Sequence, residues 1–171
     1  AVLMLTRFSS IAETALYGAA LVFLEVVMIF PVQLQRALLP AFSRLSTTQG
    51  GAAEMAHHSL RVVPIALFPA GAGLALLARP IMGLYPSGGF DDAAPTLAVM
   101  GLWLFIMAPG HVAGTYLTGI GRIRALVLIN LAGLAVQAVA QWHLVPRAGA
   151  YGASLAVLVT FTLVSVLTTW V

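Results

Sequence analysis

Three stretches of this chain contain no Asp, Glu, Lys or Arg: residues 93–121, 125–146 and 148–171. The hydrocarbon core of a bilayer is about 30 Å thick, and an α-helix needs about 20 residues to cross it. Each stretch is long enough to do so. Because backbone polar groups inside a membrane must be satisfied within the segment, helices are favoured. The sequence therefore predicts an all-α, polytopic membrane helix bundle.

Composition excludes a soluble domain and a nucleic-acid-binding surface. Hydrophobic residues make up 61% of the chain and charged residues 8%, which leaves too little polar surface for a soluble fold. The basic residues are all Arg and are widely spaced, whereas nucleic-acid surfaces cluster their basic side chains. There is no cysteine, so a thiolate metal site is excluded. We expect the lipid bilayer as a partner, and no nucleic acid.

Five complete spans and the end of a sixth fit the chain, as one helical lobe over residues 1–171. The expected spans cover residues 16–39, 60–85, 93–118, 124–145 and 149–171. The connections fall where helix-breaking residues cluster, and the longest expected loop covers residues 40–60. The chain opens inside an apolar run with no signal-peptide pattern, so we expect a fragment whose N-terminal lobe is missing.

Arginine placement predicts the orientation of these spans. The positive-inside rule places the end that carries more Arg in the cytoplasm. We therefore expect residues 46–53 and 121–124 to face the cytoplasm and residues 87–92 to face outward. The two sets of charged residues are Arg36, Arg44, Arg61, Arg122 and Arg124 on the inner side, and Arg7, Arg79, Arg147, Glu13, Asp91 and Asp92 on the outer side.

Polar residues inside the spans are the candidate site residues, because a charged side chain at mid-membrane costs about 2.5 to 3.5 kcal/mol. Asn130, Gln137 and Gln141 fall within about 40° of arc on one helix face. Two further candidates, Glu25 and Arg36, share a face of the first span but lie about 16 Å apart along it. Together with His111 of the third span, these residues are expected to line a hydrated cavity and bind substrate.

Each candidate also has a purely structural interpretation. Asn and Gln inside spans often join helices, at about 0.6 kcal/mol per hydrogen bond. Burial disfavours ionisation of Glu25, which makes it a candidate proton carrier. His111 serves either as a hydrogen-bonded bundle residue or as a proton relay. His57 and His58 point about 100° apart on a helix, so we expect no metal site.

Signatures of soluble enzymes do not occur. The sequence has no GxSxG, HExxH, Walker or dinucleotide-binding pattern. We therefore expect no enzyme activity, no catalytic residue and no cofactor.

Several segments resemble a family of transporters. The string ALYGAALVFLEVVMIFPVQLQRALLPAFSRL (15–45) is similar to a stretch of polysaccharide-exporting flippases with a Tyr-Gly-Ala-Ala opening, a mid-helix Glu, a Pro, and a closing Leu-Pro-Ala-x-Ser-Arg-Leu. ALLARPIMGLYPSGGFDDAAPTL (75–97) and TGIGRIRALVLINLAGLAVQAVAQWHLVPRAGAYGASLA (118–156) resemble later segments. Their order and spacing are typical of Wzx-type oligosaccharide flippases of the MOP (MATE-like) superfamily.

The resemblance implies the C-terminal lobe of a two-lobed protein in the bacterial inner membrane. Such a protein would move a polyprenyl-diphosphate-linked oligosaccharide across the membrane by alternating access. Family members vary in their cavity residues, so the resemblance assigns no substrate site to particular positions. Two alternatives stay open: a cation-coupled multidrug exporter of the MATE type, and an integral-membrane glycan polymerase or ligase. A polymerase or ligase would be expected to have a large polar outer loop.

Overall fold

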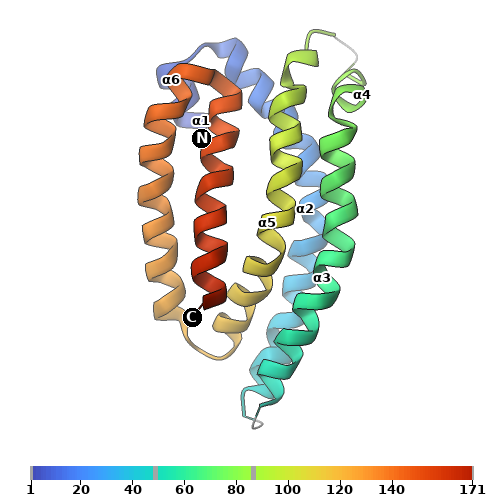
Figure 1. Ribbon diagram of the computed structural model, residues 1–171, viewed down its shortest axis with the longest axis vertical. Helices are drawn as coiled ribbons and strands as arrows, with labels where there is room; N and C mark the ends of the chain where they lie inside the picture. The colour runs from blue at the N-terminus through green and yellow to red at the C-terminus, as the bar shows by residue number, and fades with distance from the viewer. Residues whose placement is uncertain (1, 48–49, 86–87, 171) are drawn as a thin grey trace.

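The computed structural model describes residues 2–47, 50–85 and 88–170, and every regular element in this part of the chain is a helix. Four of the helices are long and apolar enough to cross a membrane: α2, α3, α5 together with the preceding η1, and α6. Figure 1 shows them as an elongated bundle. The elements are α1 (Val2–Phe8), α2 (Ile11–Leu45), α3 (Gly51–Leu76), α4 (Ala78–Met82), η1 (Asp91–Ala93), α5 (Ala94–Gly119) and α6 (Ile123–Trp170).

The longest helix, α6, is folded back on itself. At 1.5 Å per residue its 48 residues would extend about 70 Å if straight, more than twice the hydrocarbon thickness. Backbone angles leave the helical region at Ala148 (φ −139°, ψ 17°) and Gly149 (φ 50°, ψ −129°). Figure 1 shows two side-by-side arms, which we call the first arm (123–147) and the second arm (150–170). The reversal coincides with the expected connection between the spans 124–145 and 149–171, where the sequence reads Pro-Arg-Ala-Gly.

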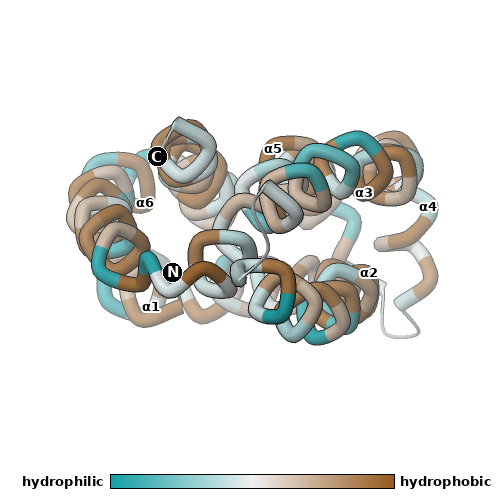
Figure 2. Tube along the Cα trace, turned by 90° about the horizontal axis from the view of Figure 1, so that it is seen from below, coloured by the Kyte–Doolittle hydropathy of each residue, from teal (hydrophilic) through white to brown (hydrophobic). Residues whose placement is uncertain are grey.

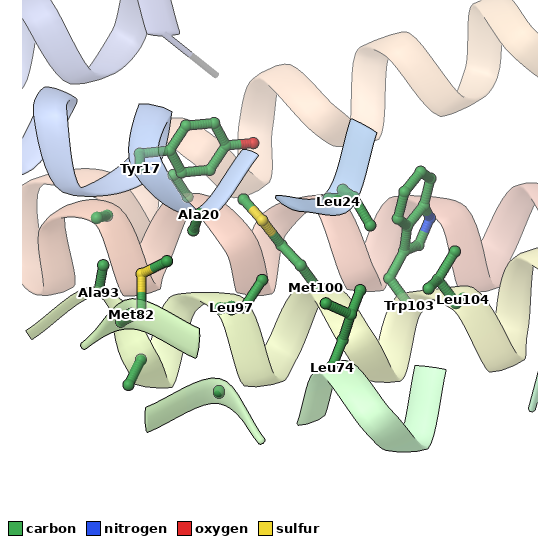
Figure 3. Packing of buried hydrophobic residues seen from close by; sticks show 14 of the residues in the cluster. Tyr17, Ala20, Leu24, Leu74, Met82, Ala93, Leu97, Met100, Trp103 and Leu104 are labelled. Atoms are coloured by element: carbon green, nitrogen blue, oxygen red, sulfur yellow. The ribbon is translucent and has the colours of Figure 1, made fainter. Parts of the chain in front are cut away.

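Helix α5 lies at the centre of the bundle and packs against α2, α3 and α6. Along the apolar 18-residue stretch of α5, 56% of the residues are buried, compared with 28% along the corresponding stretches of α2 and of α3. Figure 3 shows part of the core, where Tyr17 and Leu24 of α2 face Leu97 and Met100 of α5. Seen from below in Figure 2, hydrophobic residues run along the long helices, including their outer sides.

Small residues bring α3 and α5 close together. A Cβ added to Gly71 would lie 2.7 Å from the carbonyl oxygen of Gly101. A Cβ added to Gly101 would lie 2.7 Å from the amide nitrogen of Ala75. Helices in lipid associate largely through packing, and small residues permit this approach. The α3–α5 contact therefore depends on the absence of side chains at the two glycines.

The helix boundaries of α2 and α3 differ from the expected spans. The region 40–60, expected as the longest loop, is helical outside the connection 46–50, within which Thr48 and Gln49 lie outside the described residues. Pro40 is accommodated inside α2, where the carbonyl it leaves free belongs to the exposed Arg36. The expected span 60–85 ends at Leu76, and Leu77 (φ −96°, ψ 13°) separates α3 from the short α4.

The connections gather at two opposite ends of the bundle. Figure 1 shows the α2–α3 and α5–α6 connections at the lower end, and the α1–α2 and α4–α5 connections and the α6 reversal at the upper end. This grouping agrees with the predicted arrangement, in which residues 46–53 and 121–124 share one side and residues 87–92 take the other. Ser87 itself lies outside the described residues.

Labelling of single cysteines tests the sidedness. Thr47→Cys and Arg124→Cys in the full-length protein should react with an impermeant thiol reagent from the cytoplasmic side, and Asp91→Cys from the outer side, because all three positions are exposed at the ends of helices. Gly50 and Gly89 are less suitable, since their positive φ would strain a cysteine. Reaction of Thr47→Cys and Asp91→Cys from the same side would contradict the topology.

Candidate functional site

A cavity of about 220 Å³ lies between α5 and both arms of α6, with one side chain from α2. We call it the α5–α6 cavity. Its apolar wall includes Met107, Leu126, Phe161 and Val164. The polar residues that line it are Gln35, His111, Thr115, Thr118, Asn130, Ser165 and Thr168.

A second cavity of about 340 Å³ adjoins the first between the two arms of α6. Asn130, Phe161 and Val164 line both cavities, and Gln137 and Thr160 line only the second. The arms approach closely here, because a Cβ added to Gly133 would meet the side chains of the second arm. The two cavities therefore adjoin along the α6 hairpin, and Asn130 lies at the wall that they share.

The structure brings together three of the six predicted site residues. His111 lines the first cavity, Gln137 the second, and Asn130 both, with its Nδ2 donating to the carbonyl oxygen of Leu126 at 2.8 Å. Gln141 lies on the same helix face as Asn130 and Gln137, and we call the three residues the polar stripe. It is only 3% exposed and lines neither cavity. Its Nε2 has no hydrogen-bond partner among the described residues.

The upper part of α6 is covered by α1, which explains why Gln141, the uppermost residue of the polar stripe, does not line the cavities. Phe8 of α1 and Trp142 of α6 meet edge to face, with ring centroids 5.0 Å apart. Leu5 of α1 is fully buried, and α1 packs against α6. The three residues of the polar stripe therefore share one helix face but lie in two environments: Asn130 and Gln137 line the cavities, and Gln141 is buried.

His111 joins α5 to α2 at a proline. Its Nε2 lies 3.2 Å from the carbonyl oxygen of Pro31. A carbonyl oxygen can only accept, so Nε2 carries the hydrogen and, in the neutral ring, Nδ1 is an acceptor. Pro31 also lacks an N–H, which leaves the carbonyl of Val27 without its usual helical partner and makes bending easier there.

The hydroxyl groups around the α5–α6 cavity donate to backbone carbonyl oxygens. Ser165 of the second arm donates to Ile106 of α5 at 2.8 Å and so links two helices. The threonines donate within their own helices, as polar side chains in apolar surroundings commonly do. These bonds are Thr115 to His111 at 2.7 Å, Thr118 to Gly114 at 2.8 Å and Thr168 to Val164 at 2.6 Å.

Glu25 and Arg36 are not brought to these cavities. Both side chains are exposed on α2 and share one face, about 20° apart around the helix. Val26 and Ile29 beside them are also about 60% exposed. The structure thus separates the sequence-predicted residues into a cavity group on α5 and α6 and an exposed group on α2.

Exposed faces of the other helices differ from that of α2. In the first arm of α6 the exposed side chains are mostly apolar apart from Asn130, and those in the middle of α3 are mostly large and apolar. The middle of α2 instead exposes Glu25, Gln33 and Arg36 among apolar residues. The large apolar residues exposed on the other two helices are Val62, Ile65, Phe68 and Leu76 in α3, and Val127, Leu128, Leu131, Leu134, Val139 and Trp142 in α6.

A contact at the upper end was not predicted from the sequence. Ser10 caps α2 by accepting from the backbone N–H of Glu13 at 3.1 Å, in the Ser-x-x-Glu spacing of a capping box. The Glu13 carboxylate does not bond back to its own helix start. Its Oε2 accepts from the N–H of Ala150 at 2.7 Å, at the start of the second arm of α6. The local pattern signals a helix start, but nothing in it indicates a partner 137 residues away.

A third recess, of about 430 Å³, surrounds this contact and is lined by Glu13, Asp92, Thr96 and Tyr151, among others. It contains two carboxylates. Within the part of the chain that the structure describes, no three His, Asp or Glu side chains lie close enough together to hold a metal ion.

Comparison of the chain with protein-family models, with curated proteins and with solved structures finds no match.

Proposed function

We propose that this chain is one lobe of a transporter that moves a polyprenyl-diphosphate-linked oligosaccharide across the bacterial inner membrane by alternating access. The observation that carries the proposal is the exposed polar face of α2, where Glu25 lies in the middle of a helix long and apolar enough to span a membrane and Gln33 and Arg36 follow toward its lower end. The segments that resemble Wzx-type flippases include this helix.

The physical argument starts from the cost of exposing these side chains to lipid. A charged side chain at mid-membrane costs about 2.5 to 3.5 kcal/mol, so such residues usually face protein or a water-filled cavity. The apolar exposed faces of α3 and of the first arm of α6 are suited to lipid, whereas the α2 face is not. We infer that the α2 face borders a hydrated path shared with a second lobe of the same protein.

In this interpretation the two arms of α6 are separate spans. Each arm is about 20 residues or longer, which is sufficient to cross the hydrocarbon core. The lobe then has five complete spans, with α1 as the end of a sixth. A substrate with a charged diphosphate and a hydroxyl-rich head group suits a face that offers both a carboxylate and a guanidinium group.

Transport is favoured over glycan polymerisation or ligation by the size of the outer connections. The residues between α4 and η1 number fewer than ten, from 83 to 90, and the α6 reversal occupies only Ala148 and Gly149. Neither provides the large polar loop expected of a membrane enzyme that acts on the lipid diphosphate.

Complementation tests the proposed function. A strain that lacks the full-length gene should accumulate lipid-linked oligosaccharide in the inner leaflet, and the gene should restore its surface display. Purified full-length protein in liposomes should make a labelled lipid-linked oligosaccharide accessible to an external glycosidase. Protein that expels cationic drugs but leaves the lipid-linked oligosaccharide inaccessible would favour the MATE-type alternative and contradict the proposal.

Asn130 and Gln137 provide a test of the cavities. Asn130→Leu with Gln137→Leu should preserve membrane insertion, because it makes the helix more apolar, but reduce export about eightfold if two polar contacts of about 0.6 kcal/mol each are lost. Gln141→Leu is the matched control on the same stripe. It lies outside the cavities and removes an unpaired buried amide, so it should leave export unchanged and raise thermal stability.

Export that survives the double substitution while thermal stability falls would identify Asn130 and Gln137 as packing residues.

A further inference from the structure

Most of the polar groups that line the α5–α6 cavity have their hydrogens already used, and the amides of Gln35 and Asn130 offer both donors and acceptors. Four hydroxyl groups donate to backbone carbonyls, and the Nε2–H of His111 is directed to Pro31. A hydroxyl oxygen that donates its hydrogen keeps two acceptor lone pairs, and a neutral imidazole keeps one at the second nitrogen. The unused capacity of these five groups is therefore entirely acceptor capacity, which suits a hydrogen-bond donor or a positive charge.

His111 is the only titratable residue among those that line the cavity. From α2 the cavity receives Gln35, and from the two arms of α6 it receives Asn130, Ser165 and Thr168, none of which is charged. The charged groups of α2 nearest in sequence, Glu25 and Arg36, are exposed and line neither cavity. A proton added to His111 is thus not countered by a carboxylate of the lining, and the neutral acceptor oxygens of the lining are the groups that can solvate it against the cost of burial.

We propose that His111 is a proton-binding residue, and that its protonation is coupled to the position of α2 through the hydrogen bond to Pro31. The inference rests on the proposed function in one respect: the proposed function explains why proton binding would be linked to the polar face of α2. Proton binding itself follows from the acceptor-rich cavity and from the histidine within it.

The added proton has a defined position. In the neutral ring Nε2 carries the hydrogen that bonds Pro31, so the incoming proton binds at Nδ1. Nδ1 then changes from acceptor to donor, while Nε2 remains a donor to the same carbonyl. The imidazolium N–H is also a stronger donor than that of the neutral ring, since charge-assisted hydrogen bonds are shorter and stronger. Protonation therefore tightens the His111–Pro31 contact.

Pro31 transmits this change because it lies in the helix that carries the proposed transport face. The helix is weakened at this point by the missing N–H of the proline. A stronger bond to His111 favours the α2 conformation in which the Pro31 carbonyl reaches α5. Protonation and deprotonation of His111 then shift α2 between two positions, as required of a coupling residue.

Nuclear magnetic resonance of the full-length protein in nanodiscs tests the proton site directly. With labelled histidine, the His111 resonances are those lost in His111→Gln. They should show a neutral ring with hydrogen on Nε2 at about pH 8 and an imidazolium at about pH 5, the interval in which histidine side chains titrate. A ring that stays neutral with hydrogen on Nε2 throughout this interval would overturn the proposal and leave a structural hydrogen bond.

Cysteine labelling tests the coupling. The labelling rate of Gln33→Cys, on the exposed face of α2, is divided at each pH by that of Thr47→Cys, because thiol reactivity itself rises with pH. This ratio should change about fivefold or more between pH 5 and 8, which is the lower end of the usual coupling between linked sites. His111→Gln keeps an amide donor for Pro31 but binds no proton, so it should remove this pH dependence. His143→Gln, an exposed histidine of α6, is the matched control and should retain it.

Equal pH dependence in His111→Gln and His143→Gln would overturn the coupling. Both measurements are independent of export, so a failure of the flippase assay with positive labelling and resonance results would contradict only the proposed function.

Discussion

Glu25→Gln is expected to remove most export while the protein inserts and accumulates normally. Gln is nearly isosteric with Glu and keeps hydrogen-bonding capacity, but it does not ionise. Glu25 lies exposed near the middle of α2, on the face that we propose borders the hydrated path. A carboxylate in this position is suited to pair with a cationic group as the path opens to either side. The measurement is export by complementation, with protein level determined in the same cells.

Glu54→Gln is the matched control for this substitution. Glu54 is also exposed, but it lies in the first turn of α3 at the lower end of the bundle, outside the apolar part of the helix. Its replacement should leave export unchanged. Near-normal export by Glu25→Gln would show that its charge has no role, and a fall in protein level that matches the fall in export would indicate a folding role.

Gly71→Ala is expected to destabilise the bundle by about 1–3 kcal/mol, the usual effect of an extra methyl group in a packed interface. The new Cβ would lie 2.7 Å from a backbone oxygen of α5 and 3.2 Å from Leu104. A backbone oxygen in a helix moves only with the helix, so α3 and α5 must separate. Unfolding of the purified protein by SDS titration measures the change.

Gly73→Ala, two residues further along α3, is its control. A Cβ at Gly73 has no neighbour within 4 Å among the described residues. Alanine is favoured over glycine inside a helix by up to about 1 kcal/mol, so this variant should be unchanged or more stable. Equal stability losses in the two variants would show that close packing at Gly71 is not the cause.

The helical class and the places where the chain turns could be predicted because they depend on local signals. Uncharged runs indicated membrane helices, and the Pro-Arg-Ala-Gly link indicated the reversal in α6. The end of α2 was not predicted. The expected span stopped at residue 39, but near a helix end the carbonyl that Pro40 leaves free can be solvated, so α2 continues to Leu45.

The candidate site could be predicted only helix by helix. Periodicity showed that Asn130, Gln137 and Gln141 share a face, but not that α1 packs over the upper part of α6. It also placed Glu25 on a polar face without showing that this face points away from the α5–α6 cavity. Rotation of a helix relative to its neighbours depends on packing between distant segments, as in the bond between His111 and Pro31, 80 residues apart.

The bond between Glu13 and Ala150 has a consequence for the order of assembly during synthesis. Its acceptor is made 137 residues before its donor. Helix α2 therefore enters the membrane while its carboxylate still faces water at the upper end, and the second arm of α6 supplies the partner later. At about 5–20 residues per second, translation separates the two events by roughly 7–30 s. Until the second arm of α6 arrives, α2 and α6 are not joined at the upper end, and insertion of this arm makes the contact.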